Sequence, residues 1–409
     1  MTDILIEHQC PQCGAPAVLK ETDRLFSCQF CRVSSYLLQD GFFRYMLPNA
    51  APETKDLLFF PYWRVKGMLF SCVDSGIEHK FIDFSHQAVE SRYFPNSLGL
   101  RSQALKLNFV TPEVSGYFLE PTFSFKKVMD IFQHRFNKSL SSPIFQQSHV
   151  GDTVSLIYSP YYKEEKIYDA VLNKAVTTIP PDDFETASLI GGRPNWFTQF
   201  IPTLCPGCGW DLEGRRDALV LNCKNCNSVW RPTKNGFKQL KFSIMESKEE
   251  NVIYLPFWRI KADVKGITLN SYADLVRIAN LPKAIQRNWE DKEFRFWSPA
   301  FKVRPRVFIR LGRSITLSQP MEKMQRELPD ALIYPVTLPI KDAVESLTIN
   351  LASFMKPQED LFPLLRDISI KPESYILVYI PFVEQQHEFV QPAFFLTLNK
   401  NQLLLASNL

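Results

Sequence analysis

The residues IEHQCPQCGAPAVLKETDRLFSCQFCRVSSY, at positions 6–36, have a counterpart in IPTLCPGCGWDLEGRRDALVLNCKNCNSVWR, at positions 201–231. Each stretch contains two Cys-x-x-Cys pairs that are separated by fourteen residues. Every cysteine of the second stretch lies 195 positions after its counterpart, so the two stretches align without a gap. The eight cysteines are Cys10, Cys13, Cys28, Cys31, Cys205, Cys208, Cys223 and Cys226.

The spacing of these cysteines is typical of a metal site. A two-residue spacer lets a single turn direct both thiolates of a pair at one ion. Pro11 and Pro206 stiffen the first turn of each set, and Gly14 and Gly209 permit a positive φ there, so that backbone N–H groups can point at sulfur. The residues between the pairs then form a hairpin that brings the second pair round to complete a tetrahedron.

These two modules resemble zinc ribbons, over about residues 7–36 and 201–231. The resemblance is specific for a metal and says little about function. It implies two structural zinc ions per chain, one in each set of four cysteines. In small zinc modules the energy of metal binding is also energy of folding.

Three other uses of the cysteines are disfavoured. A disulfide framework is disfavoured, because no signal-peptide segment precedes the first pair and long secreted chains rarely keep such pairs. An iron site of the rubredoxin kind has similar turns, but the short spacer favours zinc. A catalytic zinc is disfavoured because four thiolates leave no position for water. The ninth cysteine, Cys72, lies in an apolar segment and is expected to be a small buried hydrophobe.

The same offset relates residues beyond the cysteines. It maps Gly41-Phe42 onto Gly236-Phe237, and FPYWRVK at 60–66 onto LPFWRIK at 255–261. About 57 residues therefore align without a gap, and self-similarity at a long period indicates a repeated structural unit. We expect a tandem duplication.

Both copies then predict the same order of elements. Apolar residues at helical spacing predict helices over 122–137 and 341–355. Strands are predicted over 167–172 and 394–398, each ending in Leu-Asn-Lys, where Asn-Lys suits a hairpin turn into a third short strand. The second copy is longer, and its surplus predicts a further helix over 271–289.

The sequence therefore predicts an α+β protein, in which each half is a zinc ribbon followed by a mainly antiparallel β-sheet with one or two helices. The halves are expected to pack as a pseudo-twofold pair, because duplicated modules commonly bury equivalent faces. The predicted units are a first ribbon (1–45), a first α+β domain (46–180), a linker (181–202), a second ribbon (203–240) and a second α+β domain (241–409).

The repeated Pro-aromatic-Trp-Arg-aliphatic-Lys motif gives a first set of candidate binding residues. Side chains alternate along a strand, so Trp faces one side while Arg and Lys face the other. One interpretation has Trp packed beneath the ribbon and the cations on a solvated or salt-bridged face. The other is a paired surface for an anion or a protein partner. The residues concerned are Trp63, Arg64, Lys66, Trp258, Arg259 and Lys261.

A second candidate set lies in the segment 302–310, which the alternation of basic and apolar residues predicts as a strand. Its basic face with one aromatic suits a phosphate backbone. Pro305 indicates an edge strand or a bulge, and cations on an edge also serve to block edge-to-edge pairing. The residues on that face are Lys302, Arg304, Arg306, Phe308 and Arg310.

Composition excludes several classes of protein. The chain has 409 residues with 47 Lys and Arg against 43 Asp and Glu, a formal charge of +4. Such balance argues against a dedicated polyanion binder, whose domain pI usually exceeds about 9. A hydrophobic content of 45% with 33 Phe excludes a disordered chain. The longest strongly apolar run, 57–63, is far shorter than the roughly 20 residues that span a bilayer, and we expect a cytoplasmic protein.

Motifs for catalysis are scarce. The sequence holds no phosphate-binding loop, dinucleotide glycine motif, nucleophile elbow or HExxH. His79, Asp83 and His86 lie close together, but such a cluster is more often a surface feature than a catalytic site. No small-molecule substrate is evident.

Three hypotheses for function follow. The first is a non-enzymatic zinc-binding adaptor, a scaffold or assembly subunit that docks protein partners through its ribbons and aromatic-rich sheet surfaces. The alternative is a nucleic-acid-binding protein that uses the basic faces of the second half. An enzyme of unrecognised type is the residual hypothesis.

Overall fold

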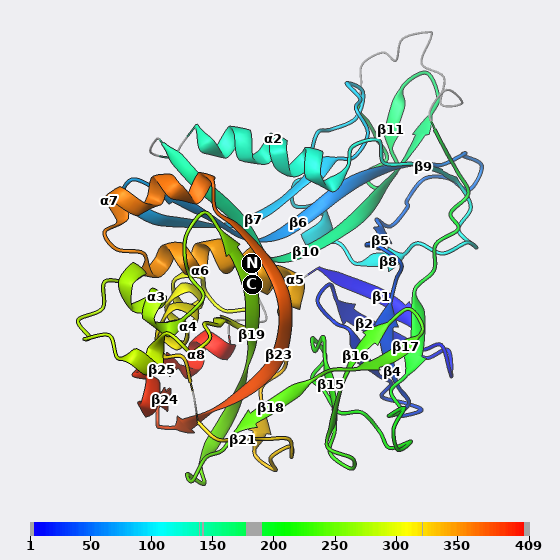
Figure 1. Cartoon of the computed structure of the whole chain (residues 1–409). Coiled ribbons are helices and arrows are strands. Elements are labelled where there is room, and N and C mark those ends of the chain that lie inside the picture. The colour runs from blue at the N-terminus through cyan, green and yellow to red at the C-terminus, as the bar shows by residue number, and fades with distance from the viewer. Residues whose placement is uncertain (1–3, 139, 141–142, 177–189, 321, 405–409) are drawn as a thin grey trace.

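The computed structural model describes residues 4–138, 140, 143–176, 190–320 and 322–404. In these ranges the fold is mixed α+β and consists mostly of sheet (Figure 1). An eleven-stranded sheet belongs to the first half, and an eight-stranded sheet belongs to the second. Two three-stranded sheets lie at the cysteine modules. None of the described helices is long and apolar enough to cross a bilayer.

Five long or central strands carry the two large sheets, and many short strands complete them. The long strands are β6 (Leu58–Val73), β7 (Gly76–Gln87), β10 (Ile144–Lys163), β19 (Val252–Lys265) and β23 (Ser369–Glu384). The short strands of the first half are β1 (Leu5–Gln9), β2 (Pro16–Lys20), β3 (Leu25–Ser27), β4 (Ser34–Leu38), β5 (Phe43–Met46), β8 (Leu107–Phe109), β9 (Tyr117–Leu119), β11 (Ile167–Asp169), β12 (Lys174–Ala175), β13 (Gly191–Gly192) and β14 (Gln199–Pro202). Those of the second half are β15 (Leu221–Cys223), β16 (Ser228–Thr233), β17 (Gly236–Gln239), β18 (Phe242–Met245), β20 (Phe296–Pro299), β21 (Met324–Gln325), β22 (Leu332–Ile333), β24 (Glu388–Gln391) and β25 (Leu396–Asn399).

The helices are short, and most of them belong to the second half. They are α1 (Arg101–Ala104), α2 (Phe125–Asn137), α3 (Tyr272–Ile278), α4 (Pro305–Ser318), α5 (Ile340–Glu345), α6 (Leu347–Phe354), α7 (Gln358–Leu361) and α8 (Lys400–Leu404). Single turns of 3₁₀ helix form η2 (Arg287–Trp289), η3 (Phe362–Arg366) and η4 (Pro392–Phe394).

The centre of the first sheet is the strand β6. It pairs antiparallel with both β7 and β10, and all 16 of its residues are buried. Its aromatic and β-branched residues suit a strand covered on both faces. Helix α2 covers one face, with Met129 packed against Val65 (Figure 1). The helix predicted over 122–137 is thus confirmed, and it begins after Ser124, whose hydroxyl accepts a hydrogen bond from a backbone N–H of the first turn.

The strands that contain the two tryptophan motifs have the same pattern of neighbours in the two large sheets. Trp63 of β6 lies opposite Leu156 of β10, and Trp258 of β19 lies opposite Leu377 of β23. A short parallel strand joins the start of each long one, β9 beside β6 and β22 beside β19. A parallel strand also joins the partner of each, β5 beside β10 and β18 beside β23. The central strand order is therefore the same in both sheets.

The hydrogen bonds of the two tryptophans also correspond. The indole N–H of Trp63 donates to the carbonyl of Phe123 at 2.7 Å, shortly before α2 begins. The indole N–H of Trp258 donates to the carbonyl of Leu338 at 3.0 Å, shortly before α5 begins. Each tryptophan thus fixes the entry of a helix onto its sheet.

Four predicted elements differ from the structure. The segment 302–310 does not form a strand, because helix α4 begins at Pro305, where the missing N–H of proline costs nothing. The helix predicted over 271–289 is two short pieces, α3 and η2. The helix predicted over 341–355 is likewise two short helices, α5 and α6. The last predicted strand of the second copy is the helix α8, so only the first copy uses Asn-Lys as a hairpin turn, between β11 and β12.

Part of the predicted linker, 181–202, takes part in sheets. Its residues 181–189 lie outside the described residues. Beyond them β13 pairs with β9 of the first large sheet, and β14 pairs with β4 of the first cysteine module. This segment therefore ties the first half to the start of the second.

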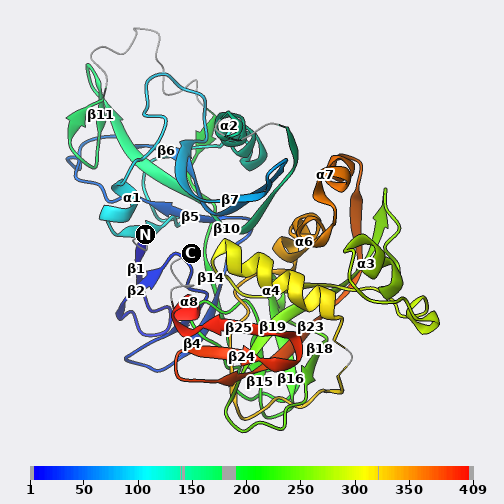
Figure 2. The same ribbon diagram turned by 90° about the vertical axis from the view of Figure 1, so that its left-hand side faces the viewer.

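The two halves share a hydrophobic core. Met68, Phe70, Cys72 and Val150 of the first sheet are buried in one cluster with the core of the second half. The contact joins a sheet face of the first half to helices α4, α5 and α6 of the second half (Figure 2). Because those faces are not equivalent, the expected packing of the two α+β parts as a pseudo-twofold pair is wrong.

Candidate metal centres and the predicted binding residues

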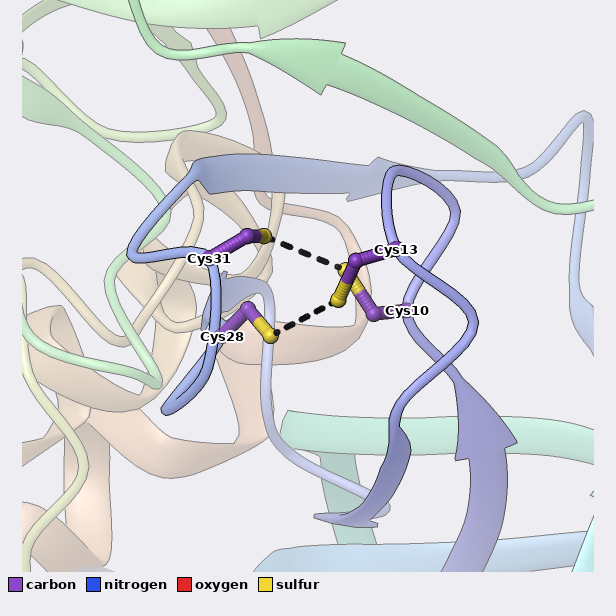
Figure 3. A group of neighbouring side chains, drawn as sticks. All are labelled: Cys10, Cys13, Cys28 and Cys31. Atoms are coloured by element: carbon purple, nitrogen blue, oxygen red, sulfur yellow. Dashed lines mark hydrogen bonds between the residues drawn. The ribbon is translucent and has the colours of Figure 1, made fainter.

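The first cysteine module brings four sulfur atoms together. Cys10 and Cys13 lie in the turn between β1 and β2, and Cys28 and Cys31 lie in the turn between β3 and β4 (Figure 3). The Sγ atoms of Cys10 and Cys31 are 3.7 Å apart, as are those of Cys13 and Cys28. With Zn–S bonds of about 2.3 Å, the edge of a tetrahedron of sulfurs is about 3.8 Å. The four thiols therefore have the geometry to hold one metal ion.

The second module repeats this arrangement. The Sγ atoms of Cys205 and Cys226 are 3.6 Å apart, and those of Cys208 and Cys223 are 3.4 Å apart. In each module the ligand atoms all lie within 4.8 Å of one another. All nine cysteines are free thiols, so the structure holds no disulfide framework.

The turns have the backbone that the sequence predicted. Gly14 and Gly209 have φ of 71° and 75°, and each donates its N–H to the carbonyl of the first cysteine of its pair. Arg32 and Asn227 have positive φ at the matching place after the second pair. These residues close each turn so that both of its sulfurs face the same point.

Hydrogen-bond donors lower the pKa of one thiol in each module. The backbone N–H groups of Cys31 and Phe30 lower the pKa of the Cys28 thiol to about 6. The side chain of Asn225 and the backbone N–H of Trp210 lower the pKa of Cys208 to about 6. The thiolate is the form that binds a metal, so these donors favour that form at one ligand of each module. Burial and the neighbouring thiols raise the pKa of Cys31 to about 11 and that of Cys223 to about 12.

The two modules pack directly against each other. The N–H groups of Arg24 and Leu25 both donate to the carbonyl of Arg216, at 2.6 and 2.8 Å. The Tyr36 hydroxyl donates to the carbonyl of Ala218 at 3.1 Å. One small core contains side chains from both modules: Leu25, Tyr36, Cys205, Leu212, Ala218, Leu221, Cys223 and Trp230. The modules thus form a single unit that contains both four-cysteine clusters.

Large apolar side chains stay exposed beside these metal centres. Phe30 is 69% exposed and Val33 is 40% exposed next to the second turn of the first module. Leu204 is 52% exposed and Trp210 is 61% exposed at the first turn of the second module. We call these four residues the apolar ridge. Sequence reasoning missed the ridge, although an apolar residue beside a metal-binding turn, where no core forms, was a signal for it.

Two residues of the ridge, Val33 and Leu204, lie at the junction of the two modules. Strand β14 pairs with β4 so that Pro202 lies opposite Ser35. The hydroxyl of Thr203 then donates to the carbonyl of Ser34 at 3.4 Å, which places Leu204 next to Val33. Leu204 forms an isolated antiparallel bridge with Asp211, and the Cys205 N–H donates to the carbonyl of Trp210, so Trp210 lies on the next pair along, beside Cys205.

The first tryptophan motif does not form an exposed anion site. Arg64 is buried and forms an ion pair with Asp83 of β7, and Lys66 is buried as well. Trp63 packs against Phe42, which lies within the predicted first ribbon (1–45), and against Phe125 of α2. Trp63, Arg64 and Lys66 are thus all buried in the central strand of the first sheet and do not lie on an exposed surface.

The second motif is only partly exposed. Lys261 forms ion pairs with Glu293 at 2.6 Å and Glu373 at 3.1 Å. Arg259 lies over the ring of Trp297, and Trp258 is buried. Lys261 is therefore neutralised by two carboxylates within the chain, whereas Arg259 contacts an aromatic ring.

The basic segment 302–310 still exposes three of its predicted cations, but most of it is helix α4 and not a strand. As α4 is a helix, Arg306 and Arg310 lie one turn apart and are exposed, as is Arg304 just before the helix. Phe308 points into the core and is buried. Lys302 lies at the junction of the halves, where its amine donates to the Thr153 hydroxyl at 2.8 Å. Phe308 and Lys302 therefore leave the predicted basic face.

The histidine cluster on β7 does not converge. His79 and Asp83 lie at positions of the same parity on the strand, whereas His86 lies on the opposite face. Asp83 is engaged by Arg64, and the His86 ring contacts the carbonyl of Gln87 at 2.9 Å. These three residues form no common site.

No protein-family model, no curated protein and no solved structure matches this chain.

Proposed function

We propose that the chain is a zinc-binding adaptor, which uses its fused ribbons to dock a protein partner. The observation that carries this proposal is the apolar ridge, placed on the rigid junction of two metal centres. Exposed aromatic side chains on a fixed backbone lose little entropy on binding and are enriched among the residues that dominate interfaces. The partner is a protein with an apolar pocket for Trp210.

Zinc is the metal that the cysteine clusters fit best. Each offers four sulfur ligands, and the short sulfur–sulfur distances suit a tetrahedral ion. Four thiolates complete the coordination shell, which favours a structural role and a non-enzymatic protein.

We also propose that the halves arose by tandem duplication. The constant spacing of the cysteines supports this, as do the matched strand order and the matched tryptophan hydrogen bonds. After the duplication, the second half gained helices that the first half lacks. These helices pack against the sheet of the first half and form a shared core with it.

The test of the adaptor function is a pull-down with the tagged full-length chain. We expect Leu204→Ser together with Trp210→Ser to lose a partner that the wild type retains. The matched control is Leu172→Ser together with Leu332→Ser, which removes two exposed leucines elsewhere, 51% and 66% exposed. Recovery of the same partners by both double variants would contradict the proposal.

A further inference from the structure

We propose that helix α4 and the loop between β24 and β25 form a binding surface for single-stranded nucleic acid. Figure 2 shows α4 lying across this face of the molecule, with β24 and β25 beside it. The surface combines a stripe of arginines with one protruding aromatic ring. It lies away from the metal centres and is independent of the adaptor proposal.

The arginine stripe follows the outer face of α4. Arg306, Arg310 and Arg313 are spaced four and three residues apart, so they lie on one side of the helix, and Arg304 precedes its first turn. Within the ranges that the structure describes, no carboxylate forms an ion pair with any of the four. The Nε of Arg313 is buried without a hydrogen-bond partner among the described residues.

This arrangement is unfavourable for the folded chain alone. Like charges one turn apart destabilise a helix, and cations at its N-terminus oppose the helix dipole. The first turn of α4 has no acidic residue to offset them. An anionic ligand along the stripe would offset the repulsion between the arginines, and it would also interact favourably with the N-terminal end of the helix dipole.

The aromatic ring is that of Phe395. It is 95% exposed, and its backbone has a φ of 52°, in the left-handed region that phenylalanine rarely occupies. Arg310 donates to the carbonyl of Thr397 at 2.7 Å, two residues further on, which fixes this loop against the stripe. A strained backbone that holds an apolar ring in water indicates a binding role for that ring.

Single-stranded nucleic acid fits both features. Guanidinium groups bind phosphates in bidentate fashion, and an exposed ring offers a platform on which a base stacks. An anionic membrane fits less well, because the apolar face of α4 is buried and cannot enter a bilayer. An acidic peptide would pair with the arginines but would leave Phe395 without a stacking partner.

The test is fluorescence anisotropy of the full-length chain with a labelled oligothymidylate or oligouridylate of about 16 nucleotides. We expect Phe395→Ala to weaken binding about fivefold or more, through loss of base stacking. We expect Arg306→Ala with Arg310→Ala to reduce the slope of log affinity against log salt by about 1.4, which is the contribution of two phosphate contacts on a single strand. The matched control, Lys126→Ala with Lys238→Ala, removes two exposed cations elsewhere and should leave affinity within about twofold of the wild type.

A further variant separates binding from folding. Phe395→Gly relieves the positive φ, so we expect an unchanged or higher melting temperature together with weaker binding. Equal losses of affinity in the stripe and control variants would overturn the proposal. So would the absence of salt-sensitive oligonucleotide binding, or binding of phosphatidylserine vesicles or polyglutamate in its place.

Discussion

At the scale of single residues, the junction of the two halves buries an ionisable group, the carboxyl of Asp342, and this burial affects the stability of the folded chain. Asp342 of α5 accepts a hydrogen bond from the Gly151 N–H of β10 at 3.1 Å. Burial raises the pKa of this carboxyl to about 6, although Lys302 and the Gly151 N–H act against the shift. The protonated carboxyl is thus favoured in the folded chain relative to the unfolded one.

This shift predicts a pH-dependent stability. The folded pKa of Asp342 lies above its unfolded value, so its contribution to stability is fully present below pH 4 and is lost as the pH rises through 6. Asp342→Asn mimics the protonated form, so its free energy of unfolding should exceed that of the wild type at pH 8, by at most about 3 kcal/mol. Urea unfolding at pH 5 and at pH 8 checks this.

The comparison between the two pH values is its own control. The difference between variant and wild type should shrink at pH 5, where the carboxyl is mostly protonated. A difference that does not change with pH would show that Asp342 is not the titrating group.

At the scale of elements, Trp63 and Trp258 occupy equivalent positions in the central strands of the two large sheets. Sequence reasoning found the motif because its spacing is constant, and it found α2 because the apolar residues have helical periodicity. It misread the segment 302–310, because an alternation of basic and apolar residues is compatible with a strand. Val307, Leu311 and Ile315 are spaced four residues apart, so in a helix they lie on one face. This segment forms a helix rather than a strand because that face is buried in the core.

The equivalence of the two tryptophans is testable. Trp63→Phe and Trp258→Phe each remove an indole N–H and leave a buried carbonyl without its donor. We expect each substitution to lower the free energy of unfolding by about 1–3 kcal/mol. Trp289→Phe, at a partly exposed tryptophan, should cost far less, and chemical denaturation compares the three.

A clear asymmetry would contradict this equivalence. If only one of the two buried substitutions destabilised the protein, the shared hydrogen-bond geometry would not reflect a shared structural role.

At the scale of the whole molecule, the ribbons are fused to each other and the halves share one core. The cysteine spacing predicted both metal sites, because ligand geometry is a local property of a turn. The sequence did not predict the apolar ridge, the burial of Arg64 or the exposure of Phe395. Those depend on which strands flank a segment and on what covers it, and no local pattern specifies such tertiary contacts.

Both the fold of the cysteine modules and the proposed adaptor surface depend on two bound metal ions, which native mass spectrometry with elemental analysis of the purified full-length chain detects directly. We expect about two zinc ions per chain, about one in Cys208→Ser, and about two in Cys72→Ser, since Cys72 is buried in the core away from both clusters. Iron in place of zinc, a metal-free wild-type chain, or loss of an ion from Cys72→Ser would contradict the account.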